Sequence, residues 1–136
     1  MDEKIIKKSD SEWATKLTTE QFRVCRQKDT EPPFSGKLYS CQENGIYCCV
    51  CCDNQLFRSA EKFDSGSGWP SFWQPLSVDC VRYESDTSHG MVRVEVLCNR
   101  CDAHLGHVFD DGPDPTRKRY CINSVTLKFN KAEVNT

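Results

Sequence analysis

The chain has 136 residues, ten of them cysteines, and a formal net charge of −2. The length suits a single domain over residues 1–136, and the acidic balance leaves no global positive field, so we expect neither nucleic acid nor a membrane surface as a partner. At about 7% of the residues, the cysteines fall just below the ~8–10% of disulfide scaffolds, so in a reducing compartment they indicate metal or redox chemistry.

The N-terminal segment predicts helix and lacks a targeting sequence. Charges interrupt the start, "MDEKIIKKSDSEW", and no segment approaches the ~20 apolar residues of a membrane span, so we expect a cytoplasmic protein. Residues 11–28 predict a short helical layer, in which Thr18 and Gln21 fit a capping box. Two prolines and a terminal glycine in residues 29–36 predict a loop that ends the helix.

From Gly36 onward the sequence predicts short β-strands. The extended runs are separated by glycine, proline, aspartate and asparagine, and they include "GIYCCV", "GMVRVEVLC" and "YCINSVTLKF". In the second run three valines alternate with Arg93 and Glu95, the period-2 pattern of a strand with one face in water. Residues 130–136 predict a frayed tail, so we expect a core over about 17–129 with flexible ends.

Two pairs of cysteines with CxxC spacing predict a structural zinc site. One CxxC turn directs two thiolates at one point, and a second turn from a distant strand completes a tetrahedral Cys₄ site for Zn²⁺. The predicted ligands are Cys49, Cys52, Cys98 and Cys101.

Two other ligand sets compete with this interpretation. Cys48 and Cys51 also have CxxC spacing, which makes the first pair ambiguous. A local Cys₂His₂ site is the second alternative, because four candidate ligands fall at every third position, namely Cys98, Cys101, His104 and His107.

Aromatic and histidine residues supply candidates for a binding pocket. "DSGSGWPSFW", residues 64–73, predicts a rigid loop that presents Trp69, whose indole could hold a methyl group or could be a core residue under a tight turn. "AHLGHVFDDGP", residues 103–113, places His104 and His107 on one loop. Such imidazoles can serve as general acids, although each alone is more often structural or a metal ligand.

Cys121 lies in a strand that we predict over residues 119–129. One face of this strand carries Arg119, Cys121 and Asn123 and then becomes apolar, so the sulfur lies where the strand leaves the core. Arg119 favours the nucleophilic thiolate, and Asn123 can donate a hydrogen bond to the sulfur or to a substrate. The alternative is a small packed side chain on a strand.

Several ordered motifs resemble the methionine-R-sulfoxide reductases, the MsrB family. They are the paired CxxC turns, "LTTEQFRVCRQKDTEPPFSG", "SGSGWPSF", "HLGHVFDDGP" and "RYCINS", and the similarity runs from about Leu17 to Phe129. The resemblance implies a mainly β fold of two antiparallel sheets, with a zinc ion distant from the reacting centre. It implies reduction of the R epimer of methionine sulfoxide, chiefly in proteins. We expect thioredoxin as the reductant and a monomer.

The resemblance also implies roles for individual residues. Cys121 is the nucleophile, and the residues around it are Trp69, His104, His107, Phe109, Arg119 and Asn123. In the implied mechanism the Cys121 thiolate attacks the sulfoxide sulfur while His107, with or without His104, donates a proton to the oxygen. Methionine leaves and Cys121 remains as a sulfenic acid. Trp69 would hold the ε-methyl group and so select the epimer.

Ser67 departs from the pattern of the family, in which many members have a second, resolving cysteine at this position. A serine hydroxyl cannot form a disulfide, so another route must regenerate the thiol. We expect Cys25 to resolve the sulfenic acid, with Cys41 and Cys80 as alternatives. If none of them reaches Cys121, thioredoxin or a small thiol would attack directly.

Two other functions are compatible with parts of the sequence. A zinc-ribbon module for nucleic acid would explain the four cysteines, but it leaves Cys121 and the histidines without a role, and the acidic charge opposes it. A non-catalytic reader of oxidised methionine would keep the pocket, but the retained Cys121 argues against it.

Overall fold

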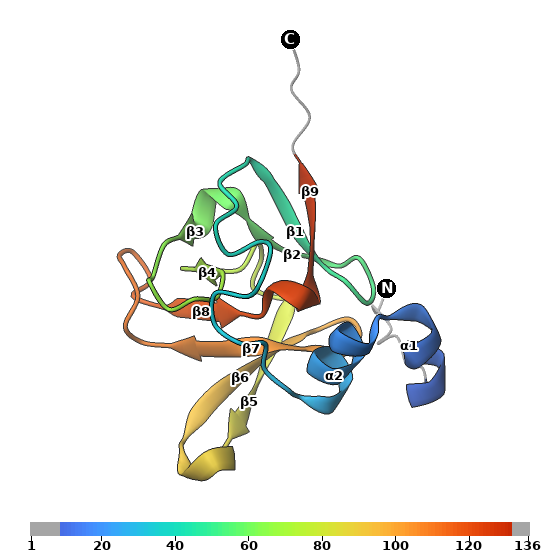
Figure 1. Cartoon of the computed structure of the whole chain (residues 1–136). Helices are drawn as coiled ribbons and strands as arrows, with labels where there is room; N and C mark the ends of the chain where they lie inside the picture. Colours follow the sequence, from blue (N-terminus) through green and yellow to red (C-terminus); the bar gives the residue numbers. More distant parts are fainter. Residues whose placement is uncertain (1–8, 132–136) are drawn as a thin grey trace.

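The computed structural model of the chain describes residues 9–131 and is built mainly from antiparallel strands (Figure 1). Two helices, α1 (Asp10–Lys16) and α2 (Thr19–Gln27), precede the strands. The strands are β1 (Gly45–Cys49), β2 (Gln55–Arg58), β3 (Lys62–Phe63), β4 (Ser71–Phe72), β5 (Val81–Asp86), β6 (Arg93–Cys98), β7 (His104–Phe109), β8 (Arg119–Ile122) and β9 (Leu127–Lys131). This arrangement confirms the expected fold class.

The predicted N-terminal helical layer consists of two short helices. Thr18 and Gln21 form the predicted capping box, which begins α2 and so divides the helical segment predicted over 11–28. Ser9 and Glu12 form an equivalent box at the start of α1. Each box satisfies backbone N–H groups that have no partner within the helix, which is why a helix starts at each position. Lys28, with φ of 60°, ends α2.

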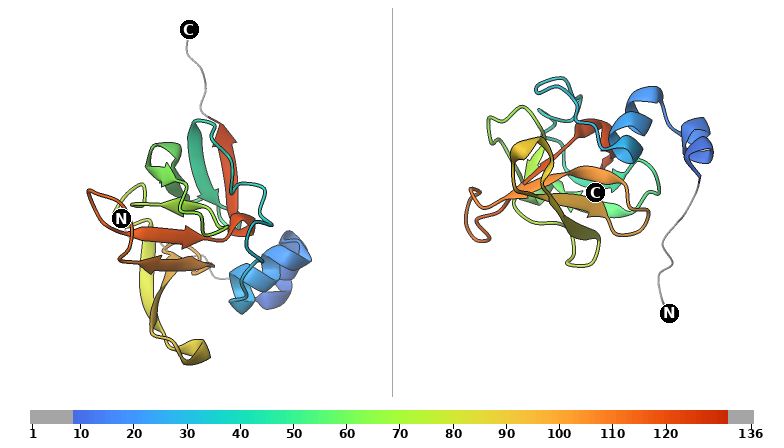
Figure 2. Two further views of the ribbon diagram at one scale, coloured as in Figure 1. Left: turned by 60° about the vertical axis from the view of Figure 1, so that its left-hand side comes forward. Right: turned by 90° about the horizontal axis from the view of Figure 1, so that it is seen from below.

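The strands form two sheets. One has the order β2-β1-β9 and the other the order β3-β4-β8-β7-β6-β5. In both Figure 1 and the left view of Figure 2, β1 and β9 run steeply across the direction of β7 and β8. The β5–β6 hairpin, drawn in yellow and gold, extends away from the rest of the molecule.

The strand predicted over 119–129 is interrupted. β8 ends at Ile122, a 3₁₀ turn follows over Ser124–Thr126, and β9 then joins the other sheet. Thr126 donates both its N–H and its hydroxyl to the carbonyl of Asn123, a local bonding pattern that competes with extended pairing. Residues 130 and 131 of the expected tail belong to β9, and residues 132–136 lie outside the described residues.

The core lies between the two sheets and is rich in aromatic rings. Phe72 of the large sheet stacks on Phe57 of the small sheet at 4.4 Å between ring centroids, and Tyr47 lies edge-on to Phe72 at 5.1 Å. These aromatic contacts hold the two sheets together. Within residues 9–131, neither helix has the length and apolar character needed to cross a bilayer.

Candidate active site and zinc centre

Four side chains form a row across one face of the six-stranded sheet. Ser71 of β4 pairs with Cys121 of β8, Cys121 pairs with His107 of β7, and His107 pairs with Glu95 of β6. Residues directly opposite each other in a sheet project from the same face, so the register brings these groups together. The sulfur therefore lies between a hydroxyl and an imidazole.

A β-bulge places both predicted histidines on this face. His104 and His107 are three residues apart and would project from opposite faces of a regular strand. The register against β6 shifts between Val96 and Leu97, and Leu105 is the extra residue of the bulge. The two imidazole centroids consequently lie 5.5 Å apart. The histidines that we expected on a loop are thus strand residues.

A cavity of about 260 Å³ opens over Cys121. The structure brings six of the predicted site residues to its wall, and His104 lies outside that lining. The complete lining is Thr30, Ser67, Trp69, Arg93, Gly106, His107, Phe109, Arg119, Cys121 and Asn123. The cavity combines aromatic walls with cationic and hydrogen-bonding groups around one sulfur. Such a lining suits a small substrate that has both an apolar part and a polar group.

The loop after α2 holds two of these residues in place. The backbone carbonyl of Glu31 accepts a hydrogen bond from Trp69 Nε1 at 2.9 Å, and its N–H donates to Asn123 Oδ1 at 3.0 Å. The carbonyl of Leu105, at the bulge, accepts from Asn123 Nδ2 at 3.0 Å. The sequence predicted only that this loop ends a helix, and Glu31 was missed as the residue that orients Trp69 and Asn123.

Burial determines the protonation state of Cys121. The pKa of the thiol is raised above its ordinary value because desolvation outweighs the hydrogen bond from Ser67 and the positive charge of Arg119. Arg119 therefore acts in the predicted direction without producing a thiolate at neutral pH. Its guanidinium is held by Asp111 at 2.8 and 3.2 Å and lies 4.4 Å from the ring of Phe109.

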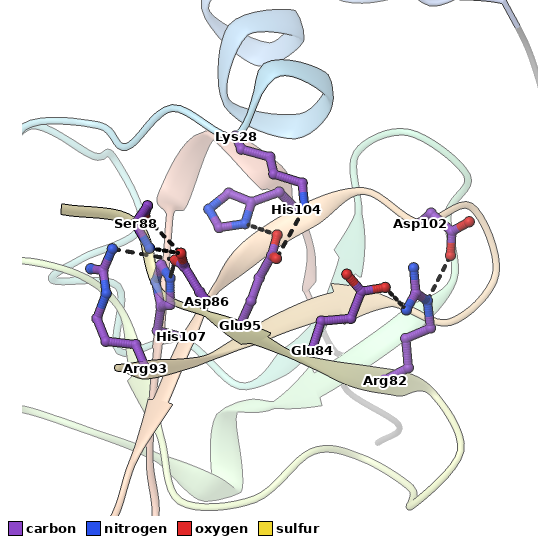
Figure 3. A network of polar contacts seen from close by, with 10 residues as sticks. All are labelled: Lys28, Arg82, Glu84, Asp86, Ser88, Arg93, Glu95, Asp102, His104 and His107. Carbon is purple, nitrogen blue, oxygen red and sulfur yellow. Dashed lines mark hydrogen bonds and ion pairs between the residues drawn. The ribbon is translucent and has the colours of Figure 1, made fainter. Parts of the chain in front are cut away.

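His107 is held by a carboxylate from the hairpin. Its Nε2 lies 2.7 Å from Asp86 Oδ2. Asp86 also accepts from the N–H and hydroxyl of Ser88 at 2.9 and 2.6 Å and from Arg93 at 3.3 Å (Figure 3). The hydrogen bonds from the Ser88 hydroxyl, His107 and the Ser88 backbone hold the pKa of Asp86 far below its usual range. Asp86 is thus a permanent anion that fixes the imidazole.

His104 is held by a second carboxylate, and Figure 3 shows the two pairs side by side on the sheet. His104 Nδ1 lies 2.7 Å from Glu95 Oε2, and Lys28 Nζ lies 3.1 Å from the other oxygen of Glu95. Burial lowers the pKa of His104 although Glu95 opposes this shift, so the imidazole is neutral at neutral pH. The sequence placed Glu95 on the wet face of a strand, but neither Glu95 nor Asp86 was predicted as a partner of a histidine.

The four predicted zinc ligands come together from two hairpin turns, one between β1 and β2 and the other between β6 and β7. The sulfurs of Cys49 and Cys101 are 3.6 Å apart, as are those of Cys52 and Cys98, and all four lie within 4.8 Å of one another. A tetrahedral ion with Zn–S bonds of ~2.3 Å needs sulfur separations of roughly 3.8 Å, so the thiolates fit zinc. None of the four lines the cavity over Cys121.

The two CxxC turns share one backbone design. In each turn the residue after the second cysteine is an aspartate with φ near 65°, Asp53 at 65° and Asp102 at 64°. Each aspartate N–H donates to the carbonyl of the first cysteine at 2.8 Å. Aspartate tolerates the left-handed conformation better than most residues, so the local sequence favours the same turn twice.

Both rival ligand sets are absent from the described residues. Asn130 donates to the sulfur of Cys48 at 3.3 Å, and the sulfur group that could hold a metal does not include Cys48 or Cys51. His104 and His107 bind carboxylates instead of completing a local site. The alternative of a local Cys₂His₂ site is therefore wrong, because the bulge turns both imidazoles toward the sheet face.

The expected resolving cysteine lies at the zinc end of the molecule. Cys25 is 2% exposed, and its thiol is hydrogen-bonded with that of Cys51, next to the ligand cluster. Cys80 is buried and donates to the carbonyls of Leu56 and Ser77. Cys41 is half-buried in another cavity. Among the described residues, no second cysteine lines the cavity over Cys121.

The sequence of the chain is similar to a known domain family and to many named proteins. Residues 17–131 match the SelR domain family. A protein from Hahella chejuensis named "Peptide methionine sulfoxide reductase MsrB" is 58% identical over 128 residues, which cover 94% of this chain and 92% of that protein. Proteins of the same name from Methanosarcina barkeri and Thioalkalivibrio sulfidiphilus are 56% and 59% identical. The match with the Methanosarcina barkeri protein covers 98% of this chain and 94% of that protein. The match with the Thioalkalivibrio sulfidiphilus protein covers 91% of this chain and 90% of that protein.

Proposed function

The chain belongs to the MsrB family of methionine-R-sulfoxide reductases, and from this premise we propose that it repairs peptide methionine-R-sulfoxide through attack by Cys121. One observation carries the assignment of the nucleophile: Cys121 lines a cavity together with His107, its partner across the sheet, and with Arg119. The four sulfurs of the zinc centre lie in the turns instead.

The reaction moves one oxygen atom from the methionine sulfur to Cys121. Cys121 gives up its thiol proton and its sulfur attacks the electrophilic sulfoxide sulfur, while His107 delivers a proton to the sulfoxide oxygen. In the adduct the oxygen passes to the Cys121 sulfur as the substrate sulfur–oxygen bond and the transient sulfur–sulfur bond break, so Cys121 becomes a sulfenic acid and methionine leaves. The thiol proton of Cys121 replaces the proton that His107 gave up. Cys121 is oxidised by two electrons and the substrate is reduced by two, so protons and electrons balance.

The surrounding residues divide the work of binding and proton transfer. Trp69 and Phe109 form the aromatic walls for the thioether end of the substrate, and the fixed indole selects the epimer by shape. Arg119 stabilises negative charge on sulfur, and Asn123, held by Glu31 and Leu105, contributes its amide to the cavity wall. His107 is the proton donor because it lines the cavity directly opposite Cys121, with Asp86 fixing its ring. His104, neutral and held by Glu95, lies 5.5 Å from His107 between ring centroids and supports it from outside the lining.

Zinc is the structural cofactor of the chain, with Cys49, Cys52, Cys98 and Cys101 as its proposed ligands. When bound, it would link two hairpin turns through four thiolates without redox activity, and it would take no part in the reaction. The separation from Cys121 supports this assignment, because none of these ligands lines the cavity.

Regeneration proceeds by attack of an external thiol on the sulfenic acid, with thioredoxin as the proposed reductant. Its thiolate forms a mixed disulfide with Cys121 and releases water, and its second thiol then frees Cys121. Cys25 would have to leave its buried position beside Cys51 to take part, so direct attack is favoured over the resolving role that we predicted for it. Ten reduced cysteines suit a cytoplasmic location, and a cavity built from one chain suits a monomer.

A single-turnover assay without reductant tests the proposal. The zinc-loaded chain is mixed with a methionine-sulfoxide peptide as separate R and S epimers, and methionine and remaining thiols are counted. We expect about one methionine per chain from the R epimer only, and the loss of about one thiol. Loss of two thiols would restore an internal resolving cysteine. No methionine from either epimer would contradict the activity and favour the zinc-module alternative.

A further inference from the structure

Ser67, which stands where many relatives have a second cysteine, touches the reacting sulfur. Its hydroxyl oxygen lies 4.0 Å from the sulfur of Cys121 and lines the same cavity. The hydroxyl cannot be oxidised to a disulfide, but it can donate a hydrogen bond. A hydroxyl at this position can therefore act on Cys121 by hydrogen bonding instead of by forming a disulfide.

Three serine hydroxyls form a chain that ends at Cys121. Ser65 Oγ lies 2.8 Å from Ser67 Oγ and 2.7 Å from Ser71 Oγ, and Ser71 is buried directly opposite Cys121 in the sheet. The N–H of Trp69 also donates to Ser67 Oγ at 3.4 Å. In the resting structure Ser67 donates its single proton to the carbonyl of Trp69 at 3.4 Å, a long bond that rotation of the hydroxyl can exchange for one to Cys121.

Each hydroxyl of this chain can rotate, so the direction of its hydrogen bonds depends on the charge of the sulfur. In the resting protein Ser71 donates to the carbonyl of Trp69 at 3.0 Å. If Ser71 turns to Ser65, and Ser65 turns to Ser67, then Ser67 donates to Cys121. Such a chain polarises its members in one direction and strengthens the last bond, particularly toward an anion.

We propose that Ser67 is a catalytic residue that donates a hydrogen bond to the Cys121 thiolate as it attacks and to the sulfenic acid that follows. Its part in the reaction rests on the proposed function, while its effect on Cys121 does not. Burial disfavours the thiolate, and in the resting structure the long contact with Ser67 and the charge of Arg119 together do not offset this effect. A hydroxyl that turns fully toward the sulfur supplies further stabilisation at the atom where negative charge develops. The product oxygen stays in contact with the same hydroxyl until an external thiol arrives.

Alkylation of Cys121 by iodoacetamide over a pH series tests this proposal without any sulfoxide. The zinc-loaded wild type is compared with Ser67→Ala, and with Ser67→Thr, which keeps a hydroxyl. Ser77→Ala, which removes an exposed hydroxyl elsewhere, is the control. Mass spectrometry of the Cys121 peptide gives the rate. For Ser67→Ala we expect the rate at neutral pH to fall about tenfold and the profile to move to higher pH, with the other two variants close to wild type.

A second variant reports the contact itself. In Ser67→Cys, one equivalent of hydrogen peroxide oxidises Cys121 to the sulfenic acid, which the introduced thiol attacks, releasing water and forming a disulfide. We expect this crosslink in most chains. Its absence, or an unchanged alkylation profile in Ser67→Ala at normal zinc content and thermal stability, would overturn the proposal. Alkylation needs no sulfoxide turnover, so failure of the proposed activity remains distinguishable from failure of this role.

Discussion

The zinc end and the cavity over Cys121 use the same atom in opposite ways. In the zinc centre four cysteine sulfurs face one another within 4.8 Å, and three of the four are buried. In the cavity one half-buried sulfur faces hydrogen-bond donors and open space, with no second cysteine among the described lining residues. Reactivity therefore follows from what surrounds the sulfur: a saturated, closed site is structural, and an open site with one free position is reactive.

This comparison predicts that the largest loss of activity comes from the smallest change in structure. Cys121→Ser should lower the rate of sulfoxide reduction by at least roughly a thousandfold, because a hydroxyl is a far weaker nucleophile than a thiolate. Zinc content and melting temperature should stay at wild-type values, since Cys121 is not a ligand of the zinc centre. Single-turnover release of methionine, measured beside zinc content, checks both parts. Surviving turnover would remove Cys121 from the role of nucleophile.

In the zinc centre a substitution should instead change metal content and stability. Cys101→Ser should release zinc and destabilise the domain by several kcal/mol or more, since the free energy of binding structural zinc is part of the folding free energy. The measurement is metal analysis together with thermal unfolding. Cys48→Ser is the matched control, because Cys48 is a buried neighbour of the ligands that lies outside the cluster. Equal loss of zinc in both variants would contradict the assigned ligand set.

The same contrast separates what could be predicted from what could not. Each CxxC pair is local: both ligands of a pair lie in one turn, and the aspartate after the pair favours the turn conformation. Cys121 and Arg119 share a strand face at i and i+2, so their proximity also follows from local periodicity. These features need no knowledge of how distant strands pair.

The support of the cavity depends on pairing across the chain and was missed. The hydrogen bond from Glu31 N–H to Asn123 joins residues 92 positions apart, and that between His107 and Asp86 spans 21 positions. The bulge at Leu105 changes which face His104 occupies, and it is set by the register of β7 against β6. A single sequence does not specify a register of this kind, because a slip of one residue reverses every side chain.

A smaller effect on activity is expected where the cavity is supported from the hairpin. Asp86→Asn keeps the shape of the side chain but removes the charge beside His107, so kcat should fall roughly ten- to hundredfold with little change in KM. Steady-state kinetics with an R-sulfoxide peptide measures the split. Glu84→Gln, a neighbour on β5 that pairs with Arg82 instead, should stay near wild type. Matching losses in the two variants would reduce Asp86 to a general structural role.

The smallest effect is expected on the rate of zinc release, from an arginine that lies beside the zinc centre. Arg26 Nη1 lies 3.8 Å from the sulfur of Cys101, Nη2 donates to the Cys101 carbonyl at 3.0 Å, and the guanidinium stacks 4.5 Å from the ring of Trp13. Four thiolates around Zn²⁺ leave a net charge of −2, which this cation partly offsets. Arg26→Met should therefore speed zinc release to a chelator by roughly tenfold.

Arg23→Met is the control, because Arg23 lies on the same helix and pairs with Asp29 at the surface. Single-turnover methionine release should be unchanged in Arg26→Met while zinc is still bound, because the charge that Arg26 offsets lies outside the cavity. Slower methionine release with zinc retained would mean that the two sulfur sites are coupled through the six-stranded sheet. Equal zinc release from both arginine variants would show that the tetrathiolate needs no cation beside it.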